Sequence, residues 1–206
     1  MTEAISSSRP TASARRQQIV DAACECARRS GFHGTRMAEI AQAAGLSVGQ
    51  IYRYFESKEA IIAAIVAQDV VEMREKFSRL EQSGTPLGEA LLNGCAEGVA
   101  RSRDPDRAAL MLEVMAEAAR NPQVAATVRE ADEEGRAIRF DIFRQIVPPD
   151  CADAELAARA EVLAMLFEGM AIRSVANPDA DRAAITEVMR SVVRHLLGDA
   201  PQPKAV

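Results

Sequence analysis

The chain has 206 residues, of which 48% are hydrophobic and 27% are charged, as in an ordinary soluble globular protein with one or two domains. No apolar run approaches the roughly 18 residues that a membrane-spanning helix needs, and the first residues lack the apolar stretch of a secretory signal. We therefore expect a cytoplasmic protein with no membrane partner.

The net charge of −5 is divided unevenly along the chain. Residues 1–58 carry a net charge of +3, and the rest of the chain carries −8. A basic N-terminal segment on an acidic remainder is typical of a DNA-binding domain attached to a larger body. An excess of three positive charges would also fit an ordinary solvated surface, so this pattern only supports that interpretation.

The first 56 residues predict a disordered arm followed by three helices. The Ser-rich residues 1–12 form the expected arm, and the helices are expected at 13–30, 36–44 and 47–54. Gly45 is suited to the left-handed conformation that ends a helix. Ser47 and Gln50 have the spacing of a capping box, which starts the next helix at once. Two short helices joined by such a turn indicate a helix-turn-helix domain over residues 13–56.

The remainder predicts six longer helices and no strand, because no stretch alternates apolar and polar residues for long enough. Thr85, Asp104 and Asn121 each precede a proline, as helix N-caps often do. The expected second domain covers 57–198, and 199–206 form a tail. Its helices are expected at 57–82, 87–102, 105–119, 122–146, 153–176 and 179–197. The predicted fold class is all-α, with about nine helices.

The last two expected helices have unusually broad apolar faces. A helix that is apolar nearly all round must be buried on more than one side, which near a chain end favours a partner subunit. The alternative is that both helices only complete a monomeric core. The residues expected at a homodimer interface are Leu166, Met170, Val188, Val192 and Leu196.

Residues that carry catalysis are sparse. His33 and His195 have no evident partner, and the fingerprints of metalloproteases, P-loops and dinucleotide sites do not occur. Glu113 and Glu117 lie four apart on one expected helix, but a solvated acidic edge explains them better than a carboxylate pair. The cysteines show neither disulfide nor metal-ligand spacing and fit small buried thiols: Cys24, Cys26, Cys95 and Cys151. We expect no catalytic residue, no metal and no cofactor.

Methionine and phenylalanine are concentrated in the central helices of the second domain. Flexible thioethers and aromatic rings suit an adaptable apolar pocket for a small molecule. Core packing explains the same residues individually. The candidate pocket residues are Phe77, Met111, Met115, Phe140, Phe143, Met165, Phe167 and Met170.

The segment IAQAAGLSVGQIYRYFESKEA resembles the signature of the TetR family of bacterial transcriptional regulators. The residues that match its pattern are Thr35, Ile40, Ala41, Ala44, Gly45, Ser47, Gly49, Tyr52, Tyr54, Phe55, Ser57, Lys58 and Glu59. The preceding RRQQIVDAACECARRSGFHGT resembles the first helix of that family. The resemblance covers about a quarter of the chain. It implies a homodimer through the last two helices and a small-molecule effector among the central ones.

This resemblance makes double-stranded DNA the expected macromolecular partner. Gln50 is expected to contact base edges, because its amide suits adenine. Phosphate contacts are expected from Thr35, Ser47, Tyr52, Tyr54 and Lys58, and either role from Arg36 and Arg53. Val48 departs from the family, where a polar or basic residue is common, and could contact a thymine methyl.

The expected function is that of a repressor released from a pseudo-palindromic operator by a small apolar or amphipathic effector. Two alternatives stay open: a ligand-independent DNA-binding protein, and an enzyme with a helix-turn-helix-like N-terminal domain. DNA binding by the purified protein separates the enzyme from the other two, and a change of DNA affinity with a ligand separates those two from each other.

Overall fold

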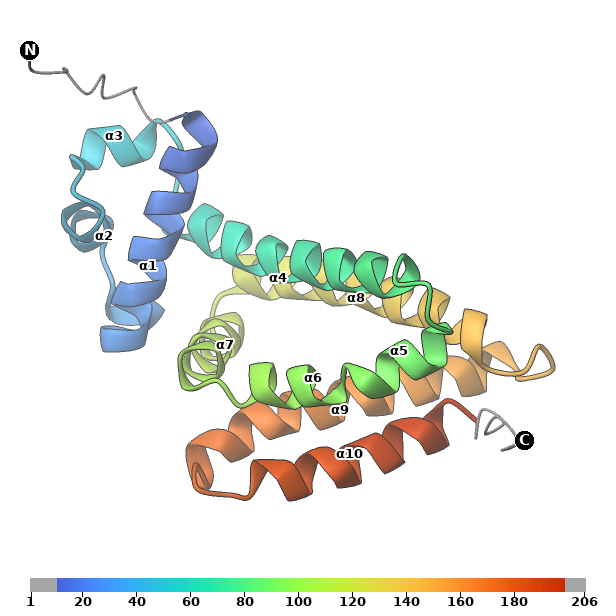
Figure 1. The fold of residues 1–206 in the computed structure, drawn as a ribbon. Coiled ribbons are helices and arrows are strands. Elements are labelled where there is room, and N and C mark those ends of the chain that lie inside the picture. Colours follow the sequence, from blue (N-terminus) through green and yellow to red (C-terminus); the bar gives the residue numbers. More distant parts are fainter. Residues whose placement is uncertain (1–10, 199–206) are drawn as a thin grey trace, which may run out of the picture. The chain divides into compact units, whose positions relative to one another are not determined.

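A computed structural model describes residues 11–198, which form ten α-helices and no strand (Figure 1). The all-α expectation is therefore confirmed. The chain divides into two compact units between Ile65 and Val66, here called the N-terminal and C-terminal units. Among the described residues, no helix is both long enough and apolar enough to cross a membrane. The expected tail 199–206 and residues 1–10 of the expected arm lie outside the described part of the chain.

The N-terminal unit contains α1 (Ala12–Gly34), α2 (Met37–Ala43), α3 (Val48–Tyr52) and the beginning of α4 (Lys58–Glu81). The Thr11 hydroxyl caps α1 by accepting a hydrogen bond from the backbone N–H of Ala14, at 3.1 Å. Thr11 and Ala12 are thus part of the folded unit, although they were expected in the arm. At Gly31 the backbone leaves the helical conformation, with φ at 71°, which glycine adopts without steric cost.

The core of the N-terminal unit is made of large apolar side chains from all four helices. These side chains are at most 2% exposed and include Ile19, Phe32, Ile40, Ile51, Phe55, Ile61 and Ile62. Because each helix contributes to one shared core, none of the short helices has to be stable alone.

The C-terminal unit contains the rest of α4 and six further helices. They are α5 (Leu87–Asn93), α6 (Cys95–Ser102), α7 (Pro105–Ala118), α8 (Pro122–Ile146), α9 (Asp153–Ala176) and α10 (Arg182–Leu196). The predicted caps at Asp104 and Asn121 are confirmed, since each side chain accepts a backbone hydrogen bond from the following turn.

Several predicted helix limits and one predicted cap were wrong. The single helix expected over 87–102 is two helices, which are separated at Gly94. Glycine has a low helix propensity, which accounts for the break. The N-cap of α5 is Pro86 and not Thr85. The last helix begins at Arg182 rather than 179, because the Asp181 carboxylate accepts hydrogen bonds from the N–H groups of Ala183 and Ala184.

The core of the C-terminal unit lies where α5, α6, α8, α9 and α10 meet. Its buried members are Cys95, Val99, Phe143, Val147, Leu156, Ala160, Met170, Met189, Val193 and Leu197. Gly98 on α6 leaves space for the Phe167 ring of α9, which packs against this core. A Cβ atom at position 98 would stand 2.9 Å from Cε1 of Phe167, which is closer than van der Waals contact allows. The Gly98–Phe167 contact thus fixes how closely α6 and α9 pack.

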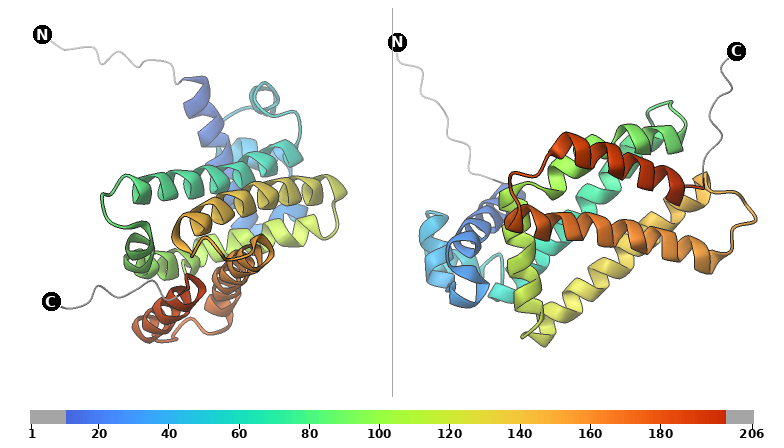
Figure 2. Two further views of the ribbon diagram at one scale, coloured as in Figure 1. Left: turned by 90° about the vertical axis from the view of Figure 1, so that its right-hand side faces the viewer. Right: turned by 90° about the horizontal axis from the view of Figure 1, so that it is seen from below.

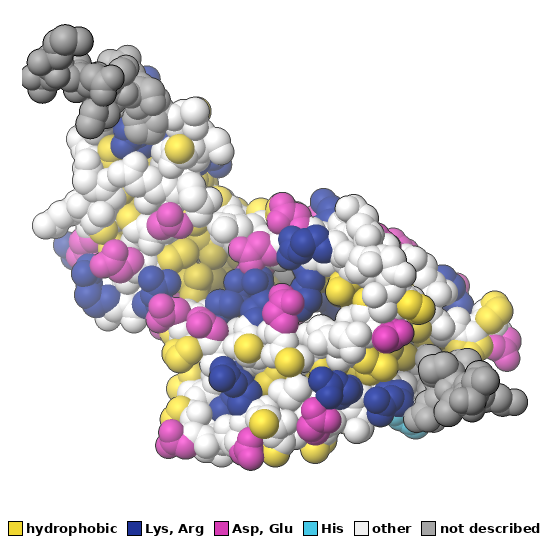
Figure 3. All heavy atoms as spheres, in the orientation of Figure 1, with side chains coloured by type: hydrophobic (Ala, Val, Ile, Leu, Met, Phe, Trp, Pro, Cys, Tyr) yellow, Lys and Arg dark blue, Asp and Glu magenta, His cyan; other side chains and the backbone are white. Residues whose placement is uncertain are grey.

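Within the C-terminal unit, α4 contributes the buried Val70 and is joined to α6, α7 and α8 by ion pairs. Arg101 of α6 and Arg107 of α7 both pair with Asp69 and Glu72 of α4. Burial raises the pKa of the Glu72 carboxyl, but hydrogen bonds and charge from Arg101 and Arg107 outweigh this and lower it. Arg74 pairs with Glu134 of α8. Side chains of both signs lie together between α4 and α6 in Figure 3.

We predict that Gly98→Ala destabilises the C-terminal unit. Alanine is ordinarily about 0.5–1 kcal/mol better than glycine inside a helix. Here the new methyl group would displace the Phe167 ring, and such overpacking costs about 1–3 kcal/mol. Chemical denaturation of the wild type and the variant measures the difference.

Two controls accompany this measurement. Gly49→Ala adds a methyl group that meets no atom within 4 Å and should not destabilise the protein. In a Phe167→Leu background the cost of Gly98→Ala should shrink, because the clashing ring is gone. An undiminished cost in that background would show that the ring is not its source.

Candidate functional site

The turn between α2 and α3 has the geometry of a helix-turn-helix. Gly45 ends α2 with φ at 63°, as predicted from its position. The next backbone N–H, that of Leu46, donates back to the carbonyl of Ala41 over 2.9 Å and reverses the chain. Ser47 then begins α3 without an intervening loop. This compact turn presents α3 on the surface of the N-terminal unit.

The predicted capping box at the start of α3 is confirmed. The backbone N–H of Gln50 donates to the Ser47 hydroxyl at 3.2 Å, and the N–H of Ser47 donates to Oε1 of Gln50 at 2.9 Å. The Gln50 side chain is exposed, but its carbonyl oxygen is engaged by the cap. Its amide NH₂ is therefore the group that can donate to a ligand while the cap stays intact.

The rest of the outer face of α3 consists of side chains that can contact DNA. Tyr52 is 53% exposed and Val48 is 38% exposed, although both are large side chains. Arg53 is also exposed, and Tyr54 is half-buried. On the inner face Ile51 is fully buried. Hence α3 is amphipathic, with an apolar anchor on one side and donor groups on the other.

Arg16 of α1 ties the end of α3 to the first helix. Its Nη1 donates to the carbonyl of Tyr54 at 2.6 Å, and its guanidinium carbon lies 4.2 Å from the centre of the Phe55 ring. Gln18, half a turn further, donates from Nε2 to the carbonyl of Ala44 at 2.6 Å. Two side chains of α1 therefore hold the turn after α2 and the end of α3. The sequence pattern gave no signal for these contacts, since the pairs are 38 and 26 residues apart.

The structure changes the roles of two expected phosphate ligands. Thr35 is 2% exposed and its hydroxyl donates to the Gly31 carbonyl at 2.7 Å, so its side chain belongs to the interior and not to the contact surface. Lys58 is half-buried, and its ammonium group donates to the carbonyls of Phe32 at 2.6 Å and Thr35 at 3.3 Å. With these two hydrogen bonds Lys58 fixes the backbone that connects α1 and α2. Arg36, in contrast, is exposed at the start of α2.

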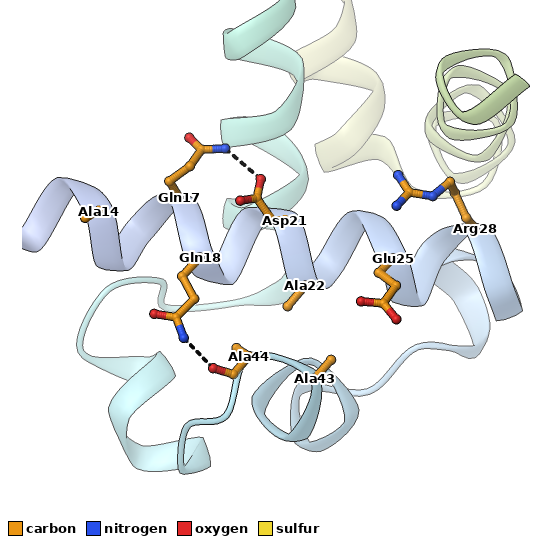
Figure 4. Close-up of a pocket in the computed structure, with 9 residues that line it drawn as sticks. All are labelled: Ala14, Gln17, Gln18, Asp21, Ala22, Glu25, Arg28, Ala43 and Ala44. Carbon is orange, nitrogen blue, oxygen red and sulfur yellow. Dashed lines mark hydrogen bonds between the residues drawn. The ribbon is translucent and has the colours of Figure 1, made fainter. Parts of the chain in front are cut away.

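An open hollow of about 610 Å³ lies on another part of the N-terminal unit, between α1 and the end of α2 (Figure 4). Asp21 and Glu25 line it, and their carboxylates would repel phosphate groups. Gln17 and Gln18 also line it, and each makes a hydrogen bond within the unit. Its acidic lining thus makes this hollow chemically different from the candidate DNA-binding face, which carries Gln50, Tyr52 and Arg53.

The structure does not bring the eight expected pocket residues together around one cavity. Phe143 and Met170 are 2% and 8% exposed and belong to the core, and Phe140 and Phe167 pack against it. Met115 and Met165 are exposed instead, at 44% and 58%. Phe77 and Met111 are half-buried. None of the eight lines the hollow of about 610 Å³ on the N-terminal unit or a second hollow of about 290 Å³ beside His195.

Helix α9 carries an exposed stripe of small and apolar residues at alternating spacings of four and three. We call it the α9 stripe; it consists of Ala158, Val162, Met165, Gly169, Ile172 and Ala176. Val162, Met165 and Ile172 are 42%, 58% and 53% exposed. The right-hand view of Figure 2 shows α9 and α10 side by side, with no other described helix covering them. This spacing is that of helices packed side by side in bundles.

Only part of the expected dimer interface lies on this surface. Val188 of α10 is 66% exposed and fits it. Met170 is buried in the core and is not available to a partner, whereas Leu166 and Leu196 are partly buried and pack against the core. Val192 is half-buried. The four-three spacing of the α9 stripe is visible in the sequence and would have placed Met165 and Ile172 on the same exposed face of the helix.

Two family models match most of the chain. Residues 19–65 match the model of bacterial regulatory proteins of the tetR family, and residues 88–198 match that of the C-terminal part of BetI-type transcriptional repressors. The second match covers more than half of the 206 residues.

Individual proteins resemble the chain over different lengths. The transcriptional regulator UidR of Escherichia coli K12 is 34% identical over 114 residues, which are 55% of this chain and 57% of UidR, so the chain matches little more than half of that relative. The regulator BetI of Cronobacter sakazakii is 27% identical over 92% of this chain and 95% of its own. The structure of Salmonella enterica GusR superposes with a TM-score of 0.73 at 27% identity and covers 89% of this chain and 95% of GusR.

The N-terminal helix-turn-helix, the helical C-terminal unit and the two matching family models agree with one another. The chain belongs to the TetR family of bacterial regulatory proteins.

Proposed function

We propose that the protein is a homodimeric, cytoplasmic transcriptional repressor that binds double-stranded DNA and is controlled by a small effector. The observation that carries this proposal is the exposed outer face of α3, which is held rigidly by a capping box at its start and by Arg16 at its end. A five-residue helix with such support offers donor groups to a DNA groove without having to be ordered on binding.

Gln50, Tyr52, Arg53 and Val48 are the proposed contacts of α3 in the major groove and on the flanking phosphates. The amide NH₂ of Gln50 donates to a base acceptor, while its oxygen keeps capping the helix. Arg36, the Ser47 hydroxyl and the Tyr54 hydroxyl are proposed phosphate ligands. The ammonium group of Lys58 donates hydrogen bonds to two backbone carbonyls of the N-terminal unit, and its positive charge favours phosphate nearby.

The α9 stripe and Val188 are the proposed dimer interface. Exposed apolar side chains at these positions gain free energy when a second copy covers them, at about 25 cal/mol per Å² of apolar surface. The family model for the C-terminal unit supports the repressor role, since it describes BetI-type transcriptional repressors. An effector must open the packing of the C-terminal unit to enter, and its differential affinity for the two states then sets the change in DNA binding.

Selection from a random duplex library tests the proposed function directly. The purified protein should enrich an inverted repeat with half-sites about one helical turn apart or more, because a two-fold dimer presents two equal α3 helices. Enrichment of no sequence above the starting library would refute the proposal.

We predict that Gln50→Ala and Gln50→Glu separate base contact from capping. Gln50→Ala removes both functions. It should relax the preference at one base step per half-site by about 1–3 kcal/mol and cost about 1 kcal/mol of stability. Gln50→Glu retains the cap acceptor for the Ser47 N–H and should keep that stability, but lose the same base preference. Selection and denaturation together measure both effects.

If Gln50 only caps the helix, Gln50→Glu will select the wild-type sequence. That outcome would remove Gln50 from the base contacts. Ser47→Ala is the matched control for stability, because it removes the other half of the same capping box.

We predict that Met165→Glu combined with Ile172→Glu makes the protein monomeric. Both side chains are exposed in the single chain, so folding is retained, whereas burial of unpaired carboxylates at an interface costs several kcal/mol. Light scattering gives the mass. Val71→Glu is the control, since Val71 is also 49% exposed but lies on α4. A double variant that stays dimeric would place the interface elsewhere.

A further inference from the structure

Arg139 of α8 is the most buried arginine among those that form ion pairs in the described residues. Its side chain is 12% exposed, whereas the others range from 27% for Arg159 to 68% for Arg79. Arg139 lines neither of the two hollows and is not among the proposed DNA contacts. Its burial therefore calls for a separate explanation.

Arg139 is also poorly paired for its burial. Its one ion-pair contact joins Nη2 to Oδ1 of Asp132 at 3.5 Å, and Asp132 is shared with Arg136 at 3.2 Å. Its Nε is buried and has no hydrogen-bond partner within the described part of the chain. Arg144 and Arg159, by comparison, each donate to a backbone carbonyl as well as to a carboxylate.

A guanidinium carries five N–H donors and no acceptor, and it stays charged at any physiological pH. Leaving such donors buried and unpaired is unfavourable, because water that would have bound them is excluded. Replacement of a poorly paired buried charge by an apolar side chain is often neutral or stabilising. We therefore expect Arg139 to add little to the stability of the ligand-free C-terminal unit, as is typical of residues kept for binding.

The guanidinium of Arg139 is closely packed against its neighbours on α8 and α4. Gly135, one turn earlier, has no side chain, and a Cβ there would lie 3.1 Å from Nη1 of Arg139 and 3.7 Å from Cε of Met73 on α4. On α9, loss of solvent raises the pKa of the Glu168 carboxyl, and the charge of Arg139 partly offsets this. The guanidinium therefore lies near Met73 of α4 and within electrostatic reach of Glu168 of α9, an exposed residue.

These contacts define the chemistry of a matching ligand. The unpaired Nε is a donor, so the ligand must bring an acceptor. A carboxylate matches a guanidinium with two parallel hydrogen bonds. A dianion such as a phosphate would be repelled by the carboxylates of Asp132 and Glu168 more strongly than a monoanion. Met73 provides an apolar contact for the remainder of the molecule.

We propose that Arg139 binds the carboxylate of an amphipathic monocarboxylic effector, whose apolar part lies against Met73 of α4. The proposal rests on the proposed function, because it names the chemical class of the effector. Helix α4 joins this position to Lys58 along one continuous helix. Displacement of Met73 by the ligand would act on α4, which side chains and not close backbone packing hold to the C-terminal unit.

The test uses the full chain and three probes of equal length: octanoate, octan-1-ol and octyltrimethylammonium. Calorimetry should show binding of octanoate to the wild type, and no binding of octan-1-ol or octyltrimethylammonium. Arg139→Met should weaken octanoate binding by about tenfold or more, since it removes a charge-assisted pair. Arg136→Met is the matched control, because Arg136 contacts the same Asp132 but is 53% exposed, and it should bind octanoate like the wild type.

The melting temperature without ligand gives a second, independent readout. Arg139→Met should melt at the wild-type temperature or higher, as expected for a poorly paired buried charge. A clearly lower melting temperature together with unchanged octanoate binding would make Arg139 a structural residue and overturn the proposal. Absence of octanoate binding to the wild type, or a preference for octyltrimethylammonium, would overturn it as well.

Binding to the selected duplex separates this proposal from the proposed function. Arg139→Met should bind that duplex as the wild type does, but octanoate should release only the wild type. If no duplex is selected by the wild type while octanoate still binds at Arg139, the proposed function fails and the carboxylate site stands. If DNA binds and octanoate does not, only the site fails.

Discussion

The candidate DNA-binding surface depends on the fixation of a helix that is too short to exist alone. A helix of five residues does not compensate for its own nucleation in water. In this protein α3 is held by burial of Ile51 and Phe55 beneath it and by the Ser47–Gln50 capping box at its start. Arg16 holds the carbonyl of Tyr54 just after its end. Every proposed DNA contact on α3 exists because these few interactions order the backbone in advance.

Features of the fold that depend on neighbouring residues could be predicted from the sequence. The turn at Gly45, the capping box, and the caps at Asp104 and Asn121 each involve residues a few positions apart, so their chemistry is visible in the chain. Most helix boundaries follow from the same local signals. The break at Gly94 was missed because the apolar pattern continues across it, while the glycine itself interrupts the helix.

Features that depend on distant residues could not be predicted in the same way. Thr35 and Lys58 match a family pattern, but only the folded chain shows that one hydroxyl is internal and that the ammonium group holds two carbonyls. The same limit applies to the C-terminal unit. Methionine and phenylalanine are compatible with a core, a pocket or an interface, and their spacing does not decide among these. Phe143 proved to be core and Met165 exposed, because the neighbouring helices cover one face of α9 and leave the other free.

The attachment of α4 by charged side chains sets an order of local unfolding within the C-terminal unit. Exposed ion pairs are screened as salt is added, with a Debye length of about 8 Å at physiological ionic strength, whereas apolar burial is not screened. The pairs of Asp69 and Glu72 with Arg101 and Arg107 are partly exposed, while Val99, Leu156 and Leu197 are at most 1% exposed. We therefore expect rising salt to weaken the contacts of α4 with α6 and α7 before it affects the apolar core, and the backbone amides of α4 to exchange earlier with solvent. The ionic strength of the cell thus acts on the same helix that the proposed effector would move.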